Sequence, residues 1–182
     1  MLKRLIPNDH LRNIAEWILI LAASALLYLF LRTFLFRTAT VSGNSMEPTL
    51  NHGDWALLSR VGYRFAKPKA GQIVAFPYKE NKAEFYVKRI AGVQGDVVDF
   101  YDHQFYVNGE LLDDEYSDDY ITLYGDVSFP LTVPEDSVFV LGDNRNYSKD
   151  SRFSAVGCVE IKEIVGKVVL RLWPLKGFGL VN

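Results

Sequence analysis

The sequence has little of the residues that build disulfides and metal centres. Its 182 residues include one cysteine, Cys158, and three histidines, His10, His52 and His103. A single cysteine excludes a disulfide within the chain. The apolar run from Val156 to Val159 around it predicts a buried strand and an unreactive thiol. The histidines form no cluster with ligand-like spacing, so we expect no metal site and no cofactor.

Concentrated charge of one sign is also scarce. The net charge is −2, and no large basic block is present. Phosphate binding needs a dense Lys/Arg footprint, so nucleic acid is excluded as the main partner. One acidic cluster stands out, and a solvated loop explains it more simply than a binding patch. Its members are Asp113, Asp114, Glu115, Asp118 and Asp119.

A long charge-free stretch occurs near the N-terminus. No residue from Trp17 to Leu31 is charged, and apolar flanks extend the stretch from about Ile14 to Phe36. This length suits a membrane-spanning helix, which needs about 20 residues. A cleaved signal peptide has a shorter apolar core that is followed by a cleavage site with small residues. The stretch here is longer, and no Ala-x-Ala-like site follows it. A buried core helix is the third possibility, but the stretch is not amphipathic. We therefore favour a retained membrane anchor.

The anchor divides the chain into three predicted parts. These are a cytoplasmic N-terminus over residues 1–13, a transmembrane helix over 14–36 and an extracytoplasmic domain over 37–182. Three basic residues precede the span and two follow it closely, which favours an internal N-terminus only weakly. They are Lys3, Arg4 and Arg12 before the span, and Arg32 and Arg37 after it. The expected location is the cell membrane, with a single pass.

Beyond Phe36, short apolar runs alternate with Gly, Pro, Asn and Asp. Their β-branched and aromatic content indicates strands. The clearest local signal is Asn108-Gly109 between two apolar segments, which predicts a tight hairpin. No long helical period appears after the anchor, so we expect a mostly β fold with one compact antiparallel β-sheet domain. The predicted strands are Trp55–Leu58, Gln72–Pro77, Phe85–Ala91, Val97–Phe100, Gln104–Val107, Ser137–Leu141 and Val165–Trp173.

Ser45 is the first candidate for chemistry. It lies in a short segment with Gly43 before it and Pro48 after it. The glycine permits an unusual φ, and the proline stiffens the chain. Such a segment can expose a hydroxyl and leave nearby amides free for an oxyanion. Taken alone, however, the segment is more simply an ordinary loop.

Lys88 is the second candidate, because it lies within the predicted strand Phe85–Ala91. Alternation places it on one face with Tyr86 and Ile90, so that a cation lies among apolar groups. A solvated position on an edge strand would explain it equally. If Lys88 is buried instead, desolvation lowers its pKa by ~2–3 units from ~10.4. A neutral lysine can then serve as the base for a serine.

Other catalytic patterns are weaker. The carboxylate pairs Asp143 with Asp150 and Asp96 with Asp99 could suggest an aspartic mechanism, but Asp96 and Asp143 follow glycines and are typical of turns. No Gly-x-Ser-x-Gly elbow is present. His10 lies before the span, so only His52 or His103 could complete a Ser-His-Asp triad.

Three segments, in this order, resemble the signature boxes of bacterial type I signal peptidases. The boxes are Ser45-Met46-Glu47-Pro48-Thr49, then Tyr86 to Gly92 with Gly95-Asp96, then Gly142-Asp143-Asn144-Arg145 with Ser148 to Arg152. Gln72 to Phe76 resembles the strand box between the first two. Each box alone is modest, but their order behind an anchor is highly specific. The single span resembles the Gram-positive type.

The resemblance implies a fold, an activity and a set of roles. The fold is that of signal peptidases and of the related LexA-like repressor proteases. The activity is removal of N-terminal signal peptides from secreted preproteins at Ala-x-Ala sites by a Ser/Lys dyad. Ser45 attacks the scissile carbonyl, and Lys88 takes its proton and later protonates the leaving amine. Supporting roles fall to Ser148, which positions the lysine, and to Asp143, Asp150 and Arg152, which organise the site. Val41, Met46, Leu50, Tyr86 and Val87 would line the small substrate pockets.

Two departures from the family pattern stand out. Gly43 occupies the position where Gram-negative members have a serine that helps to bind the oxyanion, so a second donor is not identified. Asn146-Tyr147 replaces the common Asp-Asn, a change that we expect to be tolerated.

Two rival functions fit parts of the sequence. A self-cleaving repressor-type protease would be soluble and carry a DNA-binding module. A catalytically inactive, membrane-tethered β domain could serve as an assembly factor, for example in pilus construction, but such proteins typically lack the serine or the lysine. Four aromatic residues would either dock on the bilayer or belong to the core: Tyr63, Phe65, Phe76 and Tyr78.

Overall fold

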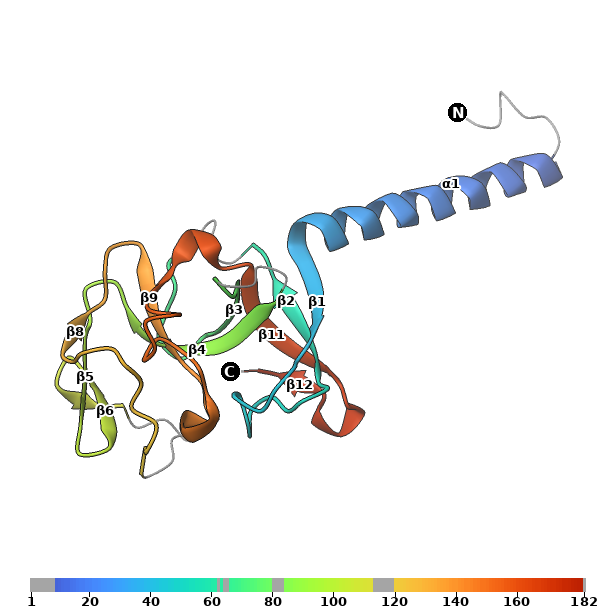
Figure 1. The fold of residues 1–182 in the computed structure, drawn as a ribbon. Helices are drawn as coiled ribbons and strands as arrows, with labels where there is room; N and C mark the ends of the chain where they lie inside the picture. The colour runs from blue at the N-terminus through green and yellow to red at the C-terminus, as the bar shows by residue number, and fades with distance from the viewer. Residues whose placement is uncertain (1–8, 62, 64–65, 80–83, 113–119, 182) are drawn as a thin grey trace. The chain divides into compact units, whose positions relative to one another are not determined.

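A computed structural model describes residues 9–61, 63, 66–79, 84–112 and 120–181 (Figure 1). The chain forms two compact units, residues 1–36 and residues 37–182. The predicted acidic cluster at 113–119 and the aromatic Phe65 lie outside the described residues.

The first unit is helical. α1 (Asp9–Phe30) continues into a π-helical turn, η2 (Leu31–Leu35). The joined helix has 27 residues and contains an 18-residue window with a mean hydropathy of 2.2, so it is long and apolar enough to cross a membrane. It begins five residues before the expected Ile14, where Asp9 supplies a favourable acidic group in the first turn. Phe36 does not belong to the helix, because it opens the first strand.

The second unit is built on a large antiparallel sheet. Its strand order is β1-β2-β11-β3-β4-β9-β10, and β12 pairs with β11. The strands are β1 (Phe36–Thr40), β2 (Trp55–Ser59), β3 (Ile73–Pro77), β4 (Phe85–Val93), β9 (Ser137–Leu141), β10 (Val159–Glu160), β11 (Gly166–Trp173) and β12 (Gly179–Leu180). Short 3-10 turns follow β9, β10 and β11 at η3 (Arg145–Tyr147), η4 (Ile161–Glu163) and η5 (Leu175–Gly177).

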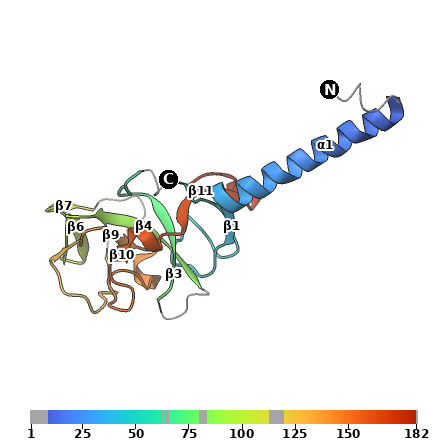
Figure 2. The ribbon, with the colours of Figure 1, turned by 90° about the horizontal axis from the view of Figure 1, so that it is seen from above.

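A smaller sheet has the order β7-β6-β5-β8. It contains β5 (Val97–Tyr101), β6 (Gln104–Val107), β7 (Glu110–Leu111) and β8 (Leu131–Thr132). Asn108 and Gly109 join β6 to β7 with φ angles of 53° and 82°, which confirms the predicted hairpin. In both views β6 lies at one end of the β domain and β1 at the other (Figures 1 and 2).

The predicted β architecture is confirmed, and the expected strands appear within two residues of their predicted ends. One local expectation was wrong. Val156 to Val159 is not a strand, because β10 begins only at Val159. Cys158 precedes it and is half-buried against a core cluster that includes Phe105 and Phe139. Burial raises the pKa of its thiol, as expected for an unreactive cysteine.

The aromatic residues offered as a docking surface belong mainly to the core. Phe76 and Tyr78 are only 4% and 8% exposed and belong to one core cluster with Ile90 and Val140. Tyr63 is half-buried and donates to Gln72 Oε1 at 2.8 Å. The core alternative therefore holds for these three residues.

Candidate active site

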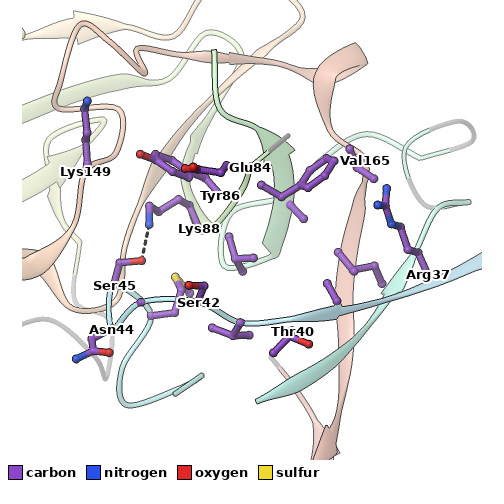
Figure 3. Close-up of a pocket in the computed structure, with 18 of the residues that line it drawn as sticks. Arg37, Thr40, Ser42, Asn44, Ser45, Glu84, Tyr86, Lys88, Lys149 and Val165 are labelled. Atoms are coloured by element: carbon purple, nitrogen blue, oxygen red, sulfur yellow. Dashed lines mark hydrogen bonds between the residues drawn. The ribbon is translucent and has the colours of Figure 1, made fainter. Parts of the chain in front are cut away.

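Ser45 and Lys88 come together in the β domain. Ser45 lies in the segment that follows β1, and Lys88 lies in the middle of β4, where it pairs in register with Val74 of β3. The Lys88 Nζ donates a hydrogen bond of 2.5 Å to the Ser45 Oγ (Figure 3). Lys88 is only 3% exposed, which excludes the solvated edge position that the sequence left open.

The burial of Lys88 has an electrostatic consequence. Desolvation lowers the pKa of Lys88 from 10.5 to about 8, because a buried ammonium loses its hydration. The negative charges of Asp150 and Asp143 oppose this shift and the positive charge of Arg152 supports it. The Nζ also lies 5.3 Å from the centroid of the Tyr86 ring. The outcome is an amine that is substantially neutral in mildly alkaline solution.

The nucleophile segment is fixed by hydrogen bonds from two sides. The Asn144 backbone N–H donates to the Ser45 carbonyl at 3.1 Å, and the Asn144 Nδ2 donates to the Asn44 carbonyl at 3.2 Å. On the other side, the Gly43 N–H donates to His52 Nδ1 at 3.1 Å. The family-like boxes therefore meet in space, since the third box holds the first in place.

An ion pair lies beside this contact. Arg89 donates through Nε and Nη2 to the two carboxylate oxygens of Asp143, each at 2.8 Å. Thr49 donates to the Asp143 Oδ2 at 2.5 Å. Asp143 is thus held as a fully paired carboxylate, which argues against an aspartic dyad with Asp150.

A second buried ion pair holds the loop after β9. Arg152 donates to both oxygens of Asp150, at 2.8 Å and 2.9 Å, and both residues have no exposed surface. Asp150 also accepts from the Gly142 N–H at 3.0 Å, while the buried Arg145 donates through Nε to the Gly142 carbonyl at 2.9 Å. Gly142 is therefore fixed at both its N–H and its carbonyl.

Ser148 departs from the expectation. Its hydroxyl is buried, yet it has no hydrogen-bond partner in the described part of the chain. A side chain at Gly142 would overlap this hydroxyl, so Ser148 packs against the glycine rather than bonding to the lysine. A role for Ser148 in positioning Lys88 stays a prediction.

A cleft of about 660 Å³ opens beside Ser45 (Figure 3). Four of the five residues expected to contact substrate line it, namely Val41, Met46, Tyr86 and Val87. The fifth, Leu50, is not among the lining residues, because it is fully buried in the core beneath the segment. Ala39, Leu58 and Ala75 also line the cleft and were not anticipated.

The histidines take other roles. His103 contacts the Ile121 carbonyl at 3.0 Å and the Tyr124 hydroxyl at 2.8 Å, both through Nδ1, and His52 contacts Gly43. Neither is bonded to Ser45. Within the described ranges, no group of three or more His, Cys, Asp or Glu could hold a metal ion.

Sequence reasoning missed several residues that hold the site together: Thr49, His52, Arg89, Asn144 and Arg145. For Arg89 the sequence did contain one signal: it is a second cation directly after Lys88 in an apolar strand, which indicates a buried counter-charge. The Asn146 Oδ1 accepts from the Thr122 N–H at 2.7 Å, and its Nδ2 donates to the Tyr120 carbonyl at 3.2 Å. That the Asn146-Tyr147 departure is tolerated stays a prediction.

A serine hydroxyl bonded to a buried lysine, at the edge of a cleft in an antiparallel β domain, defines the class of the serine peptidases that use lysine in place of histidine. A family model described as "Signal peptidase, peptidase S26" matches residues 14–173. The chain belongs to this signal peptidase family.

The chain is also similar to individual proteins. The chain is 37% identical to signal peptidase IB of Staphylococcus aureus (strain COL), over 92% of this chain and 93% of the relative. It is 35% identical to probable signal peptidase I-2 of Synechocystis sp., over 89% of this chain and 74% of that protein. A crystal structure of a signal peptidase I from Enterococcus faecalis V583 matches with a TM-score of 0.46 and 33% identity, and covers 55% of this chain and 95% of that one.

Proposed function

We propose that this protein removes N-terminal signal peptides from secreted preproteins, with Ser45 as the nucleophile and Lys88 as the general base. The observation that carries the proposal is the direct hydrogen bond between a buried lysine amine and a serine hydroxyl that faces a cleft. Membership of the signal peptidase family supplies the substrate class.

The geometry supports a stepwise mechanism. Neutral Lys88 takes the Ser45 proton as the Oγ attacks the scissile carbonyl, and the resulting ammonium protonates the leaving amine. Water then attacks the acyl-enzyme, with Lys88 again as base. The lowered pKa of Lys88 makes the neutral form available for the first step. The Ser45 N–H makes no hydrogen bond within the described residues and can serve as an oxyanion donor.

The cleft suits small apolar side chains. Its wall next to Ser45 is formed by apolar residues such as Val41, Met46 and Val87, which pack on one continuous core cluster. Charged residues also line the cleft, at Arg37, Glu84 and Lys149. In an Ala-x-Ala substrate, two alanines are separated by one residue, and the methyl group of each alanine would lie against this wall.

A membrane location supports the same function. The N-terminal helix would hold the enzyme as a single-pass anchor, with the β domain on the extracytoplasmic side. The β domain also presents large exposed apolar side chains around β11, which suit contact with lipid. They are Trp55, Trp173, Leu175, Phe178 and Leu180, each more than half exposed. We call this set the apolar patch.

Two substitutions test the catalytic assignment in the full-length protein in detergent. Ser45→Ala and Lys88→Ala should each abolish cleavage of a preprotein with an Ala-x-Ala site, without loss of the β-rich circular dichroism spectrum. Ser128→Ala and Lys162→Ala, at exposed positions outside the cleft, are matched controls and should cleave normally. Normal processing by either dyad variant would overturn the assignment.

Nothing in the described residues favours the inactive assembly-factor alternative, since both members of the dyad are present and in contact.

A further inference from the structure

His52 makes a contact that the mechanism above does not use. Its Nδ1 accepts a hydrogen bond of 3.1 Å from the backbone N–H of Gly43, two residues before the nucleophile. A backbone N–H can only donate, so the Nδ1 is the acceptor in this contact. His52 itself is exposed, and its ring is absent from the core clusters of the described residues.

The donating residue matters because Gly43 has an unusual backbone conformation. Its φ is +88°, a left-handed value that glycine adopts without strain. Glycine is also the most freely rotating residue, so an unrestrained Gly43 would let the following peptides turn. The hydrogen bond to His52 restricts rotation of the backbone at Gly43, just before the nucleophile.

The same bond settles which amides can face an oxyanion. The Gly43 N–H is already engaged by His52, whereas the Ser45 N–H makes no hydrogen bond within the described residues. The Ser45 and Asn44 carbonyls are held from the other side by Asn144. The orientation of the Ser45 N–H therefore depends on two fixed points of the backbone. Asn144 holds the Asn44 and Ser45 carbonyls, and His52 holds the Gly43 N–H.

We propose that His52 is a positioning residue of the peptidase. It acts through Gly43 to keep the Ser45 N–H and hydroxyl aligned for the transition state, and this role rests on the proposed function. An oxyanion donor works only when it points at the place where charge develops. A small rotation of the Gly43–Ser45 segment would thus lower the chemical rate without emptying the cleft of substrate.

Two substitutions separate this role from a general effect on folding. His52→Leu removes the acceptor and keeps a side chain of similar reach. His52→Asn keeps an acceptor, because its Oδ1 lies about where the imidazole Nδ1 lies. Both can be assayed as full-length protein in detergent, with an Ala-x-Ala peptide and separate determination of kcat and KM.

The expected result is a fall in kcat of about tenfold for His52→Leu, with KM within about twofold of the wild type. His52→Asn should recover most of the lost kcat, and the melting temperatures of the three proteins should agree. The inference is overturned if His52→Leu cleaves like the wild type, if His52→Asn is as slow as His52→Leu, or if KM alone changes. A wild-type protein that does not cleave the peptide would overturn the proposed function, and this inference with it.

Discussion

Arg89 and Asp143 form a two-armed ion pair that joins the centre of β4 to the loop after β9. The Arg89 Nε and Nη2 each lie 2.8 Å from a different carboxylate oxygen of Asp143. The side chains are 8% and 0% exposed. Arg89 follows Lys88 in the chain and Asp143 precedes Asn144, which holds Ser45. One buried pair therefore couples the strand that carries the base to the loop that fixes the nucleophile.

Asp143→Asn should destabilise the domain strongly. The substitution leaves the Arg89 guanidinium buried without its counter-charge, and breaking a buried pair in this way typically costs about 3–5 kcal/mol. Unfolding of the full-length protein by urea, followed by tryptophan fluorescence, measures the loss. Glu160→Gln breaks the exposed pair with Lys162 and is the control, with a much smaller expected change because the pair is solvated. Equal losses in the two variants would contradict the structural role of the Arg89 pair.

The rate of cleavage should rise with pH through the pKa of Lys88. Since the base must be neutral, kcat/KM should follow an acid limb with an apparent pKa near 8. Below that value the rate should fall about tenfold per pH unit. Measured on an Ala-x-Ala peptide, an acid limb near 6.5 would indicate a histidine base instead. Full activity reached only above pH 10 would mean that Lys88 is not desolvated.

Lys88→Met should stabilise the protein while it abolishes cleavage. Below about pH 8 both the folded and unfolded states carry the Lys88 proton, so the folded state bears the full cost of a buried ammonium. The fall in pKa from 10.5 to about 8 corresponds to roughly 3 kcal/mol. The wild type should therefore gain stability between pH 8 and 10.5, where only the unfolded state binds the proton.

Denaturation at pH 7 and pH 10 measures this pH dependence of stability. At pH 7 the Lys88→Met variant should be the more stable, by up to about 3 kcal/mol, and the gap should narrow at pH 10. A Lys88→Met variant that is less stable than the wild type at pH 7 would show that the contacts of the ammonium outweigh its desolvation.

The sequence allowed most of the β fold to be predicted, because the strands carry their own signal. Ser137–Leu141 is a continuous run of buried residues. Asn108-Gly109 marks the hairpin between β6 and β7 by turn chemistry alone. Short pairings such as β8, β10 and β12 were missed, since two residues give no periodicity and depend on the neighbouring strand.

The candidate site was predictable only in part. Local pattern left Ser45 and Lys88 ambiguous, and their order among the boxes identified them. The partners Asn144 and His52 were missed because backbone-to-side-chain bonds depend on a three-dimensional approach that no spacing specifies. Leu50 was misplaced for a related reason: adjacency to the nucleophile along the chain does not decide which side chains turn toward the core.

The apolar patch around β11 should lie against lipid. The chain has three tryptophans, Trp17 in α1 and Trp55 and Trp173 in the patch, where the last two are paired in register. In a Trp17→Phe variant reconstituted in vesicles, brominated lipids should quench much of the remaining fluorescence. A protein that keeps only Trp17 reports on the helix and is the control for lipid access. Unquenched emission from the Trp17→Phe variant would contradict lipid contact of the patch.

Gly142→Ala should inactivate the enzyme although it adds only one methyl group. A Cβ at this position would overlap the Ser148 hydroxyl and the Ser45 carbonyl oxygen, and the backbone of Gly142 is held by Asp150 and Arg145. The Ser45 segment must therefore move, and misplacement by about 1 Å can cost roughly 100-fold in rate. Gly179→Ala is the matched control, because a methyl group there meets no atom within 4 Å. Peptide cleavage by both variants measures the effect; an active Gly142→Ala enzyme would mean that the nucleophile segment tolerates displacement, against the requirement for a fixed Ser45.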